Sequence, residues 1–461
     1  MNQTFTGYSL ILLIFLTIFS FFYRDNQNNT RPSEQKTVIV VGAGISGLRA
    51  ADILSKAGMK VEVLEARNRI GGRLWSDRSL DGITLDLGAS WIHGINDNPL
   101  YEYAKKQHIL MQEWDYDKVS IFESDGSQSN LSLDNAEATD AIIAKHAILS
   151  LISNPNATVQ DVIDRAKASG DLSLYTDEQI NFFVNTEIEL GSAIDASEIP
   201  VWELYDTQSV SDEEDPEVIF PQGYDQITTG LAENQSIHLN TKVTKIDYSQ
   251  KQVIVSTTSG TYEADHVIVT VPLGVLKKQV IEFVPALPPK KQEAIDKLNM
   301  GVLNKIYLKF PHQFWDKNSD QFGYISRQKG HFSAWLNLSE ASGQPVLMAF
   351  TGGSYASKLE GLTNTQITHH AMTVLRTIYG DAIPEPLDVR ITRWGRDPYS
   401  YGSYSYVTVE ASNDMRKDLA SSIKQRVFFA GEATSEESSG TVDGAFLSGE
   451  REAEKILALQ P

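Results

Sequence analysis

The chain has 461 residues, a length typical of two or three domains. Of these residues 41% are hydrophobic and 22% are charged, which is typical of a globular protein and excludes a collagen-like, coiled-coil or wholly disordered chain. Its 60 acidic and 40 basic residues give a net charge of −20, which disfavours nucleic-acid binding over a broad surface and favours a cationic substrate or partner. The absence of cysteine excludes disulfides, thiolate metal sites, a cysteine nucleophile and a flavin attached through sulfur, and no metal site is predicted.

Residues 8–23 form an uncharged apolar run near the N-terminus. As a helix, the run would span about 24 Å, somewhat less than the hydrocarbon core of a membrane, about 30 Å. No basic residue precedes the run and aromatic residues end it, so we expect an uncleaved membrane anchor; the alternatives are a cleaved signal peptide, with export, and a core helix. Residues 1–35 would then be an anchor and a polar linker, and Arg24, Arg31 and Lys36 indicate a cytoplasmic catalytic part.

The next three elements predict a βαβ unit, with a buried strand at residues 37–41, a helix at 47–57 and a second strand at 60–65. The sequence GAGISG at residues 42–47 joins the first strand to the helix. In such a turn the first glycine permits the tight bend, the second lets the backbone approach a pyrophosphate, and the third allows the helix to pack on the strand. The helix N-terminus adds partial positive charge, so the pattern predicts a dinucleotide site.

Glu65 lies at the end of the second strand, 23 residues after Gly42, where a carboxylate can accept hydrogen bonds from an adenosine ribose. The chain continues as EARNRIGGR at residues 65–73, with two glycines and three arginines. Such a stretch can wrap around a long dinucleotide and neutralise its phosphates.

Apolar runs predict further strands at residues 238–246, 252–260, 266–274, 304–310, 346–350 and 426–433, helical or mixed structure at 135–195 and 290–300, and a C-terminal helix at 442–459. Alternation in the strand at 304–310 places Leu303, Lys305 and Tyr307 on one face. Taken by itself, that pattern makes Lys305 a solvent-facing charge on an edge strand. The acidic patch at 212–217 is predicted to be a solvated loop.

Five further motifs follow in order: LDLGASWIHG at 85–94, VTVPLGVLK at 269–277, LNKIYLKF at 303–310, RWGRDPYSYGSYSYV at 393–407, and FFAGEAT with GTVDGAFLSGEREAEKI at 428–456. With the glycine turn and its extension, these motifs make the chain similar to the flavin-containing amine oxidase family, most of all to polyamine oxidases and the catalytic domain of histone lysine demethylases. The resemblance implies a Rossmann-like α/β FAD-binding domain of residues 36–110, 218–288 and 392–461, and a mixed α+β substrate-binding domain of residues 111–217 and 289–391.

The resemblance also implies noncovalent FAD as the cofactor. The positions that match the adenosine and pyrophosphate end of its site are Gly42, Gly44, Ser46, Gly47, Glu65, Arg67, Gly72 and Arg73, with the backbone of Val243 at the adenine. Glu432 matches an acid near the pyrophosphate and ribityl chain, and Val442 a residue whose N–H faces the flavin pyrimidine edge. The remaining matches are Gly88, Ala89, Ser90, Trp91, Gly431, Thr441 and Trp394, the last packed beside the isoalloxazine unless it is simply a core tryptophan.

On the substrate side, Lys305 matches the lysine that holds a water against flavin N5. Tyr404 matches one aromatic wall of the amine channel, and Thr441 lies at the facing position, where monoamine oxidases have a tyrosine. That difference, and the absence of a cysteine to carry the flavin, count against a monoamine oxidase in the strict sense. His93 matches a pocket histidine of several polyamine oxidases, the alternative being a structural histidine.

The activity implied is oxidation of a polyamine such as spermine or spermidine to an imine and then an aldehyde, with O2 reduced to H2O2. Glu187 and Glu189 lie where such enzymes carry carboxylates for distal ammonium groups, although we expect both to be solvent-exposed. The alternatives are a monoamine or L-amino acid oxidase of the same family, a FAD-dependent desaturase-type enzyme, and a non-catalytic membrane-tethered flavoprotein. A histone demethylase proper is not expected, because neither a preceding helical chromatin-binding module nor a coiled-coil insertion is present in the sequence.

Overall fold

The computed structural model describes residues 35–80, 82–114, 118–204 and 215–460. The predicted membrane anchor at residues 8–23 lies outside the described residues. Among the helices within them, none has the length and apolar character needed to cross a membrane.

The first sheet has five parallel strands in the order β22-β13-β1-β2-β9. Its strands are β1 (Thr37–Val41), β2 (Lys60–Leu64), β9 (Ser236–His238), β13 (His266–Val269) and β22 (Val427–Phe429). Val38 and Val40 belong to one buried apolar cluster, and Ile39 and Val41 to another. Both faces of the sheet are therefore buried, which explains why β1 is an unbroken apolar run.

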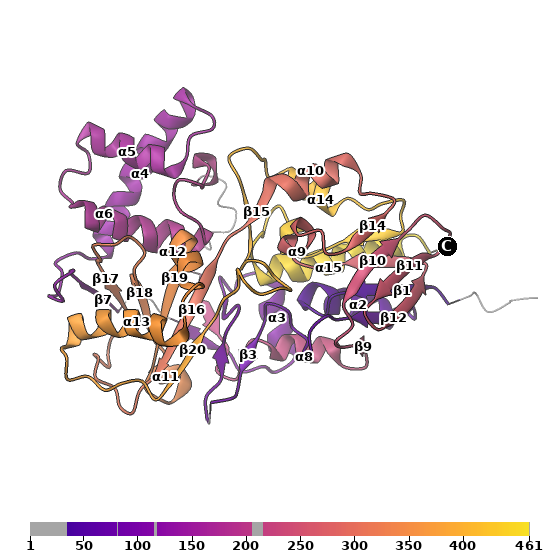
Figure 1. Ribbon diagram of the computed structural model, residues 1–461, viewed down its shortest axis with the longest axis horizontal. Coiled ribbons are helices and arrows are strands. Elements are labelled where there is room, and N and C mark those ends of the chain that lie inside the picture. Colours follow the sequence, from indigo (N-terminus) through magenta and orange to yellow (C-terminus); the bar gives the residue numbers. More distant parts are fainter. Residues whose placement is uncertain (1–34, 81, 115–117, 205–214, 461) are drawn as a thin grey trace, which may run out of the picture. The chain divides into compact units, whose positions relative to one another are not determined.

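Two long helices cover one face of this sheet, α2 (Ile45–Lys56) and α15 (Val442–Leu457) (Figure 1). Both were predicted, with bounds that differ by one or two residues. They approach closely, because a Cβ at Gly449 would lie only 2.1 Å from the carbonyl oxygen of Ser46. The glycine turn that precedes α2 is thereby held between β1 and α15.

The run at 238–246, predicted as one strand, is divided between two sheets. β9 ends at His238, Asn240 has a left-handed φ of 54°, and β10 (Val243–Asp247) begins a second sheet. This sheet has the order β12-β11-β10-β14 and is completed by β11 (Val253–Thr257), β12 (Gly260–Ala264) and β14 (Glu282–Val284). Asparagine tolerates the left-handed region better than most residues, so the sharp bend falls there.

A third, six-stranded sheet has the order β20-β16-β19-β18-β17-β7. Its strands are β7 (Val119–Phe122), β16 (Leu303–Lys309), β17 (Gln321–Tyr324), β18 (Ala334–Asn337), β19 (Val346–Gly352) and β20 (Asp388–Ile391). β16 is an inner strand that pairs with β19 on one side and β20 on the other, so the edge-strand interpretation is wrong. The helices α12 (Gly353–Leu359) and α13 (Asn364–Tyr379) pack on it through a cluster that includes Ile306 and Leu308.

The predicted helical stretch at 135–195 contains α4 (Leu133–Ser153), α5 (Val159–Ser169), α6 (Asp177–Phe183), a π-helix (Val184–Glu189) and α7 (Leu190–Ser192). The stretch at 290–300 is α10 (Pro289–Lys297) followed by β15 (Leu298–Met300), which pairs with β21 (Ser405–Val407). The other helices are α3 (Pro99–Lys106), α8 (Gln226–Ala232), α9 (Leu273–Lys277), α11 (Ser339–Ser342) and α14 (Met415–Ala420), with 3-10 turns at Val201–Leu204 and Glu432–Thr434. The short strands are β3 (Ser76–Asp77), β4 (Leu85–Asp86), β5 (Trp91–Ile92), β6 (Gln112–Trp114) and β8 (Glu217–Ile219).

The strands of the five-stranded sheet come from three separate stretches of chain, before residue 65, between 236 and 269, and after 426. The fold is a mixed α/β fold, as predicted. The domain boundaries given above stay a prediction.

Candidate functional site

At Gly42 and Gly47, the turn between β1 and α2 has no room for a side chain. Gly42 has a φ of 109°, and a Cβ at Gly47 would lie 2.1 Å from the Gly42 carbonyl oxygen. Directly after β2, the buried carboxylate of Glu65 accepts hydrogen bonds from the N–H of Ala43 at 2.7 Å and of Arg67 at 2.8 Å. Glu65 thus ties the turn to the arginine-rich extension, and its contact with a ribose stays a prediction.

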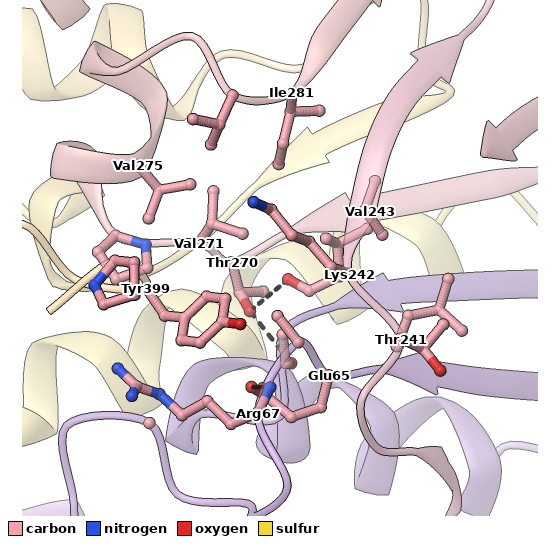
Figure 2. A pocket seen from close by; sticks show the side chains of 18 of the residues that line it. Glu65, Arg67, Thr241, Lys242, Val243, Thr270, Val271, Val275, Ile281 and Tyr399 are labelled. Atoms are coloured by element: carbon pink, nitrogen blue, oxygen red, sulfur yellow. Dashed lines mark hydrogen bonds between the residues drawn. The ribbon is translucent and has the colours of Figure 1, made fainter. Parts of the chain in front are cut away.

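A cavity of about 110 Å³ lies beside this turn. Its lining includes Gly42, Glu65, Arg67, Gly72, Arg73 and Val243, all predicted for the adenosine end of FAD (Figure 2). Figure 2 also shows the side chains of Lys242 and Tyr399 pointing into it. The Arg67 guanidinium donates two hydrogen bonds to Asp397, at 2.8 and 2.9 Å, and lies 5.1 Å from the Tyr399 ring centroid. This pairing partner of Arg67 was not predicted.

A second cavity, of about 1370 Å³, shares Arg73 with the first. The predicted residues that line it are Ser46, Arg73, Gly88, Ala89, Ser90, Trp91, His93, Lys305, Trp394, Tyr404, Gly431, Glu432, Thr441 and Val442. Residues from distant parts of the sequence are therefore brought together. Gly44 and Gly47 line neither cavity, and Gly47 instead allows α2 to pack on the turn.

The shape and charge of the two cavities fit FAD. The N-termini of α2 and α15 both border the larger cavity, through Ile45 and Val442, and the free N–H groups of a helix N-terminus favour anionic groups. A Cβ at Gly88 would lie 1.7 Å from the carbonyl oxygen of Arg73, so the backbone at Gly88 packs directly against the backbone at Arg73 in the cavity wall. A narrow and a wide cavity that share Arg73 in their linings suit a long, anionic dinucleotide.

Glu432 is a buried carboxylate where the two cavities meet. It accepts a hydrogen bond from the Arg73 guanidinium at 2.8 Å and one from the Ser405 hydroxyl at 2.6 Å. Burial alone would raise the pKa of Glu432, but the charges of Arg73 and Arg416 and the Ser405 hydrogen bond together lower it below its ordinary value. Glu432 is therefore ionised, and it holds Arg73 in place.

Lys305 is 5% exposed and points into the larger cavity from β16. Its ammonium donates to the carbonyl oxygens of Asp86 at 3.1 Å and Gly88 at 2.6 Å, and also contacts the Ser90 hydroxyl. Burial lowers the pKa of Lys305 well below its ordinary value, although the negative charge of Asp86 opposes the shift. The solvent-facing interpretation of Lys305 is wrong, because residues 86–90 cover the face of β16 that carries its side chain.

Trp394 and Tyr404 form aromatic walls of the same cavity. Trp394 is 5% exposed, and its indole N–H donates to the Leu87 carbonyl at 3.0 Å. The Tyr404 hydroxyl donates to the carbonyls of Leu190 and Gly191 at 3.0 and 2.8 Å, and burial raises the pKa of Tyr404, so the phenol stays neutral.

Thr441 faces the same cavity, but its hydroxyl caps α15. The oxygen accepts from the Gly444 N–H at 3.0 Å and donates to the Ser438 carbonyl at 2.8 Å. A tyrosine at this position would lose that cap.

His93 lies at the cavity with a side chain that is 59% exposed, and its Nδ1 is 2.7 Å from Glu217. The nearby Asp215 also lines the cavity and accepts from the N–H groups of Ile95 and Asn96 at 2.9 and 3.1 Å. Both acids belong to the patch predicted to be a solvated loop. Residues 212–214 of that patch lie outside the described residues. Asp215 is half-buried in a bend, whereas Glu217 begins β8, so the loop prediction is wrong for Glu217; both acids hold the segment that carries His93.

Glu187 and Glu189 differ in environment. Glu187 is exposed, as predicted, and it lines the larger cavity; burial against the cavity wall raises its pKa. Glu189 is 2% exposed, so the prediction of solvent exposure is wrong for it. Its carboxylate accepts from Asn185 at 3.0 Å, from the Ala196 N–H at 2.7 Å and from Lys329 at 2.6 Å. Residues two apart on a helix do not face the same side, so Glu187 lines the cavity while Glu189 points into the protein interior.

Sequence reasoning missed the backbone acceptors of Lys305 and Trp394, in residues 86–88, and a buried pair behind them, Asn304 and Glu360. Asn304 carried a signal, since an amide at an alternating core position of a strand needs a partner. Among the described residues, no group of three or more histidines and carboxylates is arranged to hold a metal ion.

Comparison with known proteins agrees with this site. The family model of flavin containing amine oxidoreductases matches residues 45–457. The chain is 36% identical to lysine-specific histone demethylase 1 homolog 3 of Oryza sativa subsp. japonica and 34% identical to lysine-specific histone demethylase 2 of Homo sapiens, in each case over 92% of this chain but only 54% and 53% of the relative. The chain thus spans about half the length of these relatives.

The structure is also similar to that of wild-type putrescine oxidase bound to putrescine. The TM-score is 0.74 at 21% sequence identity, covering 92% of this chain and 99% of that one, so the two share a fold. The glycine turn, the paired cavities and the family match lead to one conclusion: the chain belongs to the flavin containing amine oxidoreductase family and uses FAD as its cofactor.

Proposed function

We propose that this protein oxidises cationic polyamines. The observation that carries the proposal is the charge of the larger cavity: among the described residues that line it, eight are acidic and three, Lys305, Arg73 and Arg416, are basic. The acidic ones are Asp97, Glu187, Glu203, Asp215, Glu432, Glu436, Glu437 and Asp443. Glu432 contacts Arg73 and Glu436 contacts Lys417, which leaves six lining acids against Lys305 and Arg416, so the lining stays negative and attracts a polycation.

The side chains on this lining can bind and orient such a substrate. Bound FAD supplies a two-electron acceptor for oxidation of the amine and passes the electrons to O2, giving H2O2. Tyr404 and Trp394 present aromatic surfaces that hold an aliphatic chain and exclude water. The carboxylates bind ammonium groups that stay protonated, while the reacting nitrogen must be neutral to donate its lone pair. Lys305 places its ammonium in the wall of this cavity, where its positive charge would favour electron density on the bound flavin.

A second candidate is oxidation of an N-methylated lysine in a basic peptide. The relatives named as lysine-specific histone demethylases are 33–36% identical over about nine-tenths of this chain, which favours that class. We place polyamines first because several ammonium groups on one thin chain match several carboxylates in one cavity, whereas a methyl-lysine side chain carries a single charge.

The test is anaerobic stopped-flow bleaching of bound FAD by spermine, spermidine, N-acetylspermine, phenethylamine, L-phenylalanine and a dimethyl-lysine peptide, compared side by side. We expect the polyamines to bleach FAD fastest, and Lys305→Met to slow that step by about 100-fold. The control is Lys309→Met on the same strand, outside the cavity lining.

If the dimethyl-lysine peptide bleaches FAD fastest, oxidation of N-methylated lysine becomes the favoured function. Bleaching by phenethylamine or L-phenylalanine alone would indicate a monoamine or amino acid oxidase. If no amine bleaches the bound FAD, the polyamine proposal fails. A desaturase-type or non-catalytic flavoprotein would then be favoured.

A further inference from the structure

A cluster of buried polar side chains lies behind the cavity wall, on the face of β16 opposite Lys305. Asn304 is 3% exposed, Glu360 at the end of α12 is 5% exposed, and Thr392 directly after β20 is 6% exposed. Burial of a carboxylate is unfavourable unless its oxygens accept hydrogen bonds. Within the described part of the chain, no basic side chain forms an ion pair with Glu360, so its partners must be uncharged donors.

Those donors are the Asn304 amide and a backbone N–H. Glu360 Oε1 accepts from Asn304 Nδ2 and from the Gly395 N–H, each at 2.8 Å. The fit at Gly395 is tight, because a Cβ there would lie 2.8 Å from Glu360 Oε2. The carboxylate therefore holds the loop that carries Trp394, which precedes Gly395.

Asn304 extends this network to both predicted active-site residues. Its Oδ1 accepts from the Trp394 N–H and from the Thr392 hydroxyl, both at 3.0 Å. Thr392 Oγ1 in turn accepts from the Lys305 N–H at 2.8 Å. Since Oδ1 must face these donors, Nδ2 must face an acceptor, and Glu360 is that acceptor.

On the cavity side, the side chains of Lys305 and Trp394 reach the same backbone segment. Lys305 Nζ donates to the carbonyls of Asp86 and Gly88, and Trp394 Nε1 to the carbonyl of Leu87 between them. Each residue is thus fixed at its side-chain tip by residues 86–88 and at its backbone by the buried cluster. A change in the cluster would move both groups relative to that segment.

We propose that Glu360 is a positioning residue: through Asn304 and Gly395 it fixes Trp394 and the backbone of Lys305 in the geometry that amine oxidation needs. The proposal rests on the proposed function in that it assigns this purpose to the cluster. Glu360 itself touches neither cavity. Its effect should therefore fall on the rate of the reaction rather than on substrate affinity.

The experiment compares FAD-loaded wild type, Glu360→Ala and Glu360→Gln, with Asn337→Ala as the control. Asn337 is a buried asparagine of the same sheet, bonded to the Ser319 carbonyl and outside the larger cavity. Two quantities are measured: FAD bleaching at varied spermine concentration, and hydrogen exchange of the Trp394 and Gly395 amides by mass spectrometry.

In Glu360→Ala we expect bleaching at saturating spermine to slow at least tenfold, the half-saturating concentration to change less than threefold, and both amides to exchange at least tenfold faster. Glu360→Gln should stay within threefold of wild type in every measurement, because its amide oxygen can accept both hydrogen bonds. Asn337→Ala should resemble wild type.

The proposal is overturned if Glu360→Ala bleaches FAD and exchanges its amides at the wild-type rates. It is also overturned if Asn337→Ala slows bleaching as much as Glu360→Ala does. If Glu360→Ala does not fold, Thr392→Val removes the link to Lys305 and should slow bleaching in the same way; an unchanged rate in it would also overturn the proposal. If no amine bleaches wild type, the proposed function fails, and unchanged amide exchange in Glu360→Ala would still refute the positioning role.

Discussion

At the scale of single residues, the site depends on charged groups buried in an apolar surrounding. Lys305 and Glu432 are both nearly inaccessible, and the pKa of each is lowered, but for different reasons. Lys305 donates mostly to uncharged oxygens, so burial lowers its pKa. Glu432 lies beside two arginines, so its pKa falls despite burial, and the carboxylate is kept ionised.

The lowered pKa of Glu432 predicts a pH dependence of stability. Between the folded and the unfolded pKa, the unfolded state binds more protons, so Glu432 contributes stability that is present above its unfolded pKa and lost as the pH falls. Glu432→Gln should lower the free energy of unfolding at pH 7 by about 3 kcal/mol, because Arg73 loses its buried partner. This difference from wild type should stay constant from pH 7 down to about 5 and then shrink as the pH falls through the ordinary carboxyl pKa of 4.5 toward the lowered pKa of folded Glu432.

Urea unfolding of the FAD-loaded proteins at several pH values measures this difference in the free energy of unfolding between wild type and Glu432→Gln. Glu437→Gln, an exposed acid five residues further along, is the control and should change stability by no more than about 0.5 kcal/mol. A difference between wild type and Glu432→Gln that stays constant with pH would contradict the assigned role.

At the scale of secondary-structure elements, the π-helix carries one acid that lines the larger cavity and one that is buried. It presents Glu187 to the cavity and turns Glu189 inward, where Asn185, the Ala196 N–H and Lys329 satisfy its carboxylate. The next residues supply the carbonyls that fix the Tyr404 hydroxyl. One short irregular element thus carries a predicted ammonium ligand and braces an aromatic wall.

This arrangement predicts that Glu187 contributes to polyamine affinity and not to the rate. Glu187→Gln should raise the dissociation constant of spermine about tenfold, equivalent to about 1.4 kcal/mol, and leave the bleaching rate at saturation unchanged. Titration of the FAD absorption with spermine under anaerobic conditions measures the first quantity, and stopped flow the second.

The control is Glu198→Gln, an exposed acid of the next loop that does not line the cavity. If Glu187→Gln binds spermine as tightly as wild type does, Glu187 is not a substrate ligand. An equal loss in both would indicate a general effect of net charge instead.

At the scale of the whole molecule, the chain carries a net charge of −20 and concentrates acids around one cavity. Salt screens such attraction over a Debye length of about 10 Å at 0.1 M ionic strength. We therefore expect kcat/KM for spermine to fall about tenfold between low salt and 0.3 M NaCl, and kcat/KM for phenethylamine to change much less, because it carries one charge instead of four. A steady-state peroxide assay across salt concentrations checks this, and equal slopes for the two amines would contradict it.

Much of the fold was predictable because it depends on local patterns. The strand at residues 37–41, the glycine turn and the helix after it follow from an apolar run, residues without side chains and 3.6-residue periodicity. The prediction failed where a single residue ended an element. The run at 238–246 looked continuous, and only the left-handed Asn240 divides it between two sheets.

The sequence by itself determined the family and the cofactor, because the glycine turn and the motifs are local in the chain and each is tied to one chemistry. Tertiary structure alone decided which polar groups are buried together. Whether Lys305 faces water depends on residues 86–90, more than 200 positions earlier in the chain, and the acceptor of Asn304 is a glutamate 56 positions further on. No local pattern encodes such pairs, since they arise when distant segments pack and their buried donors and acceptors must be satisfied.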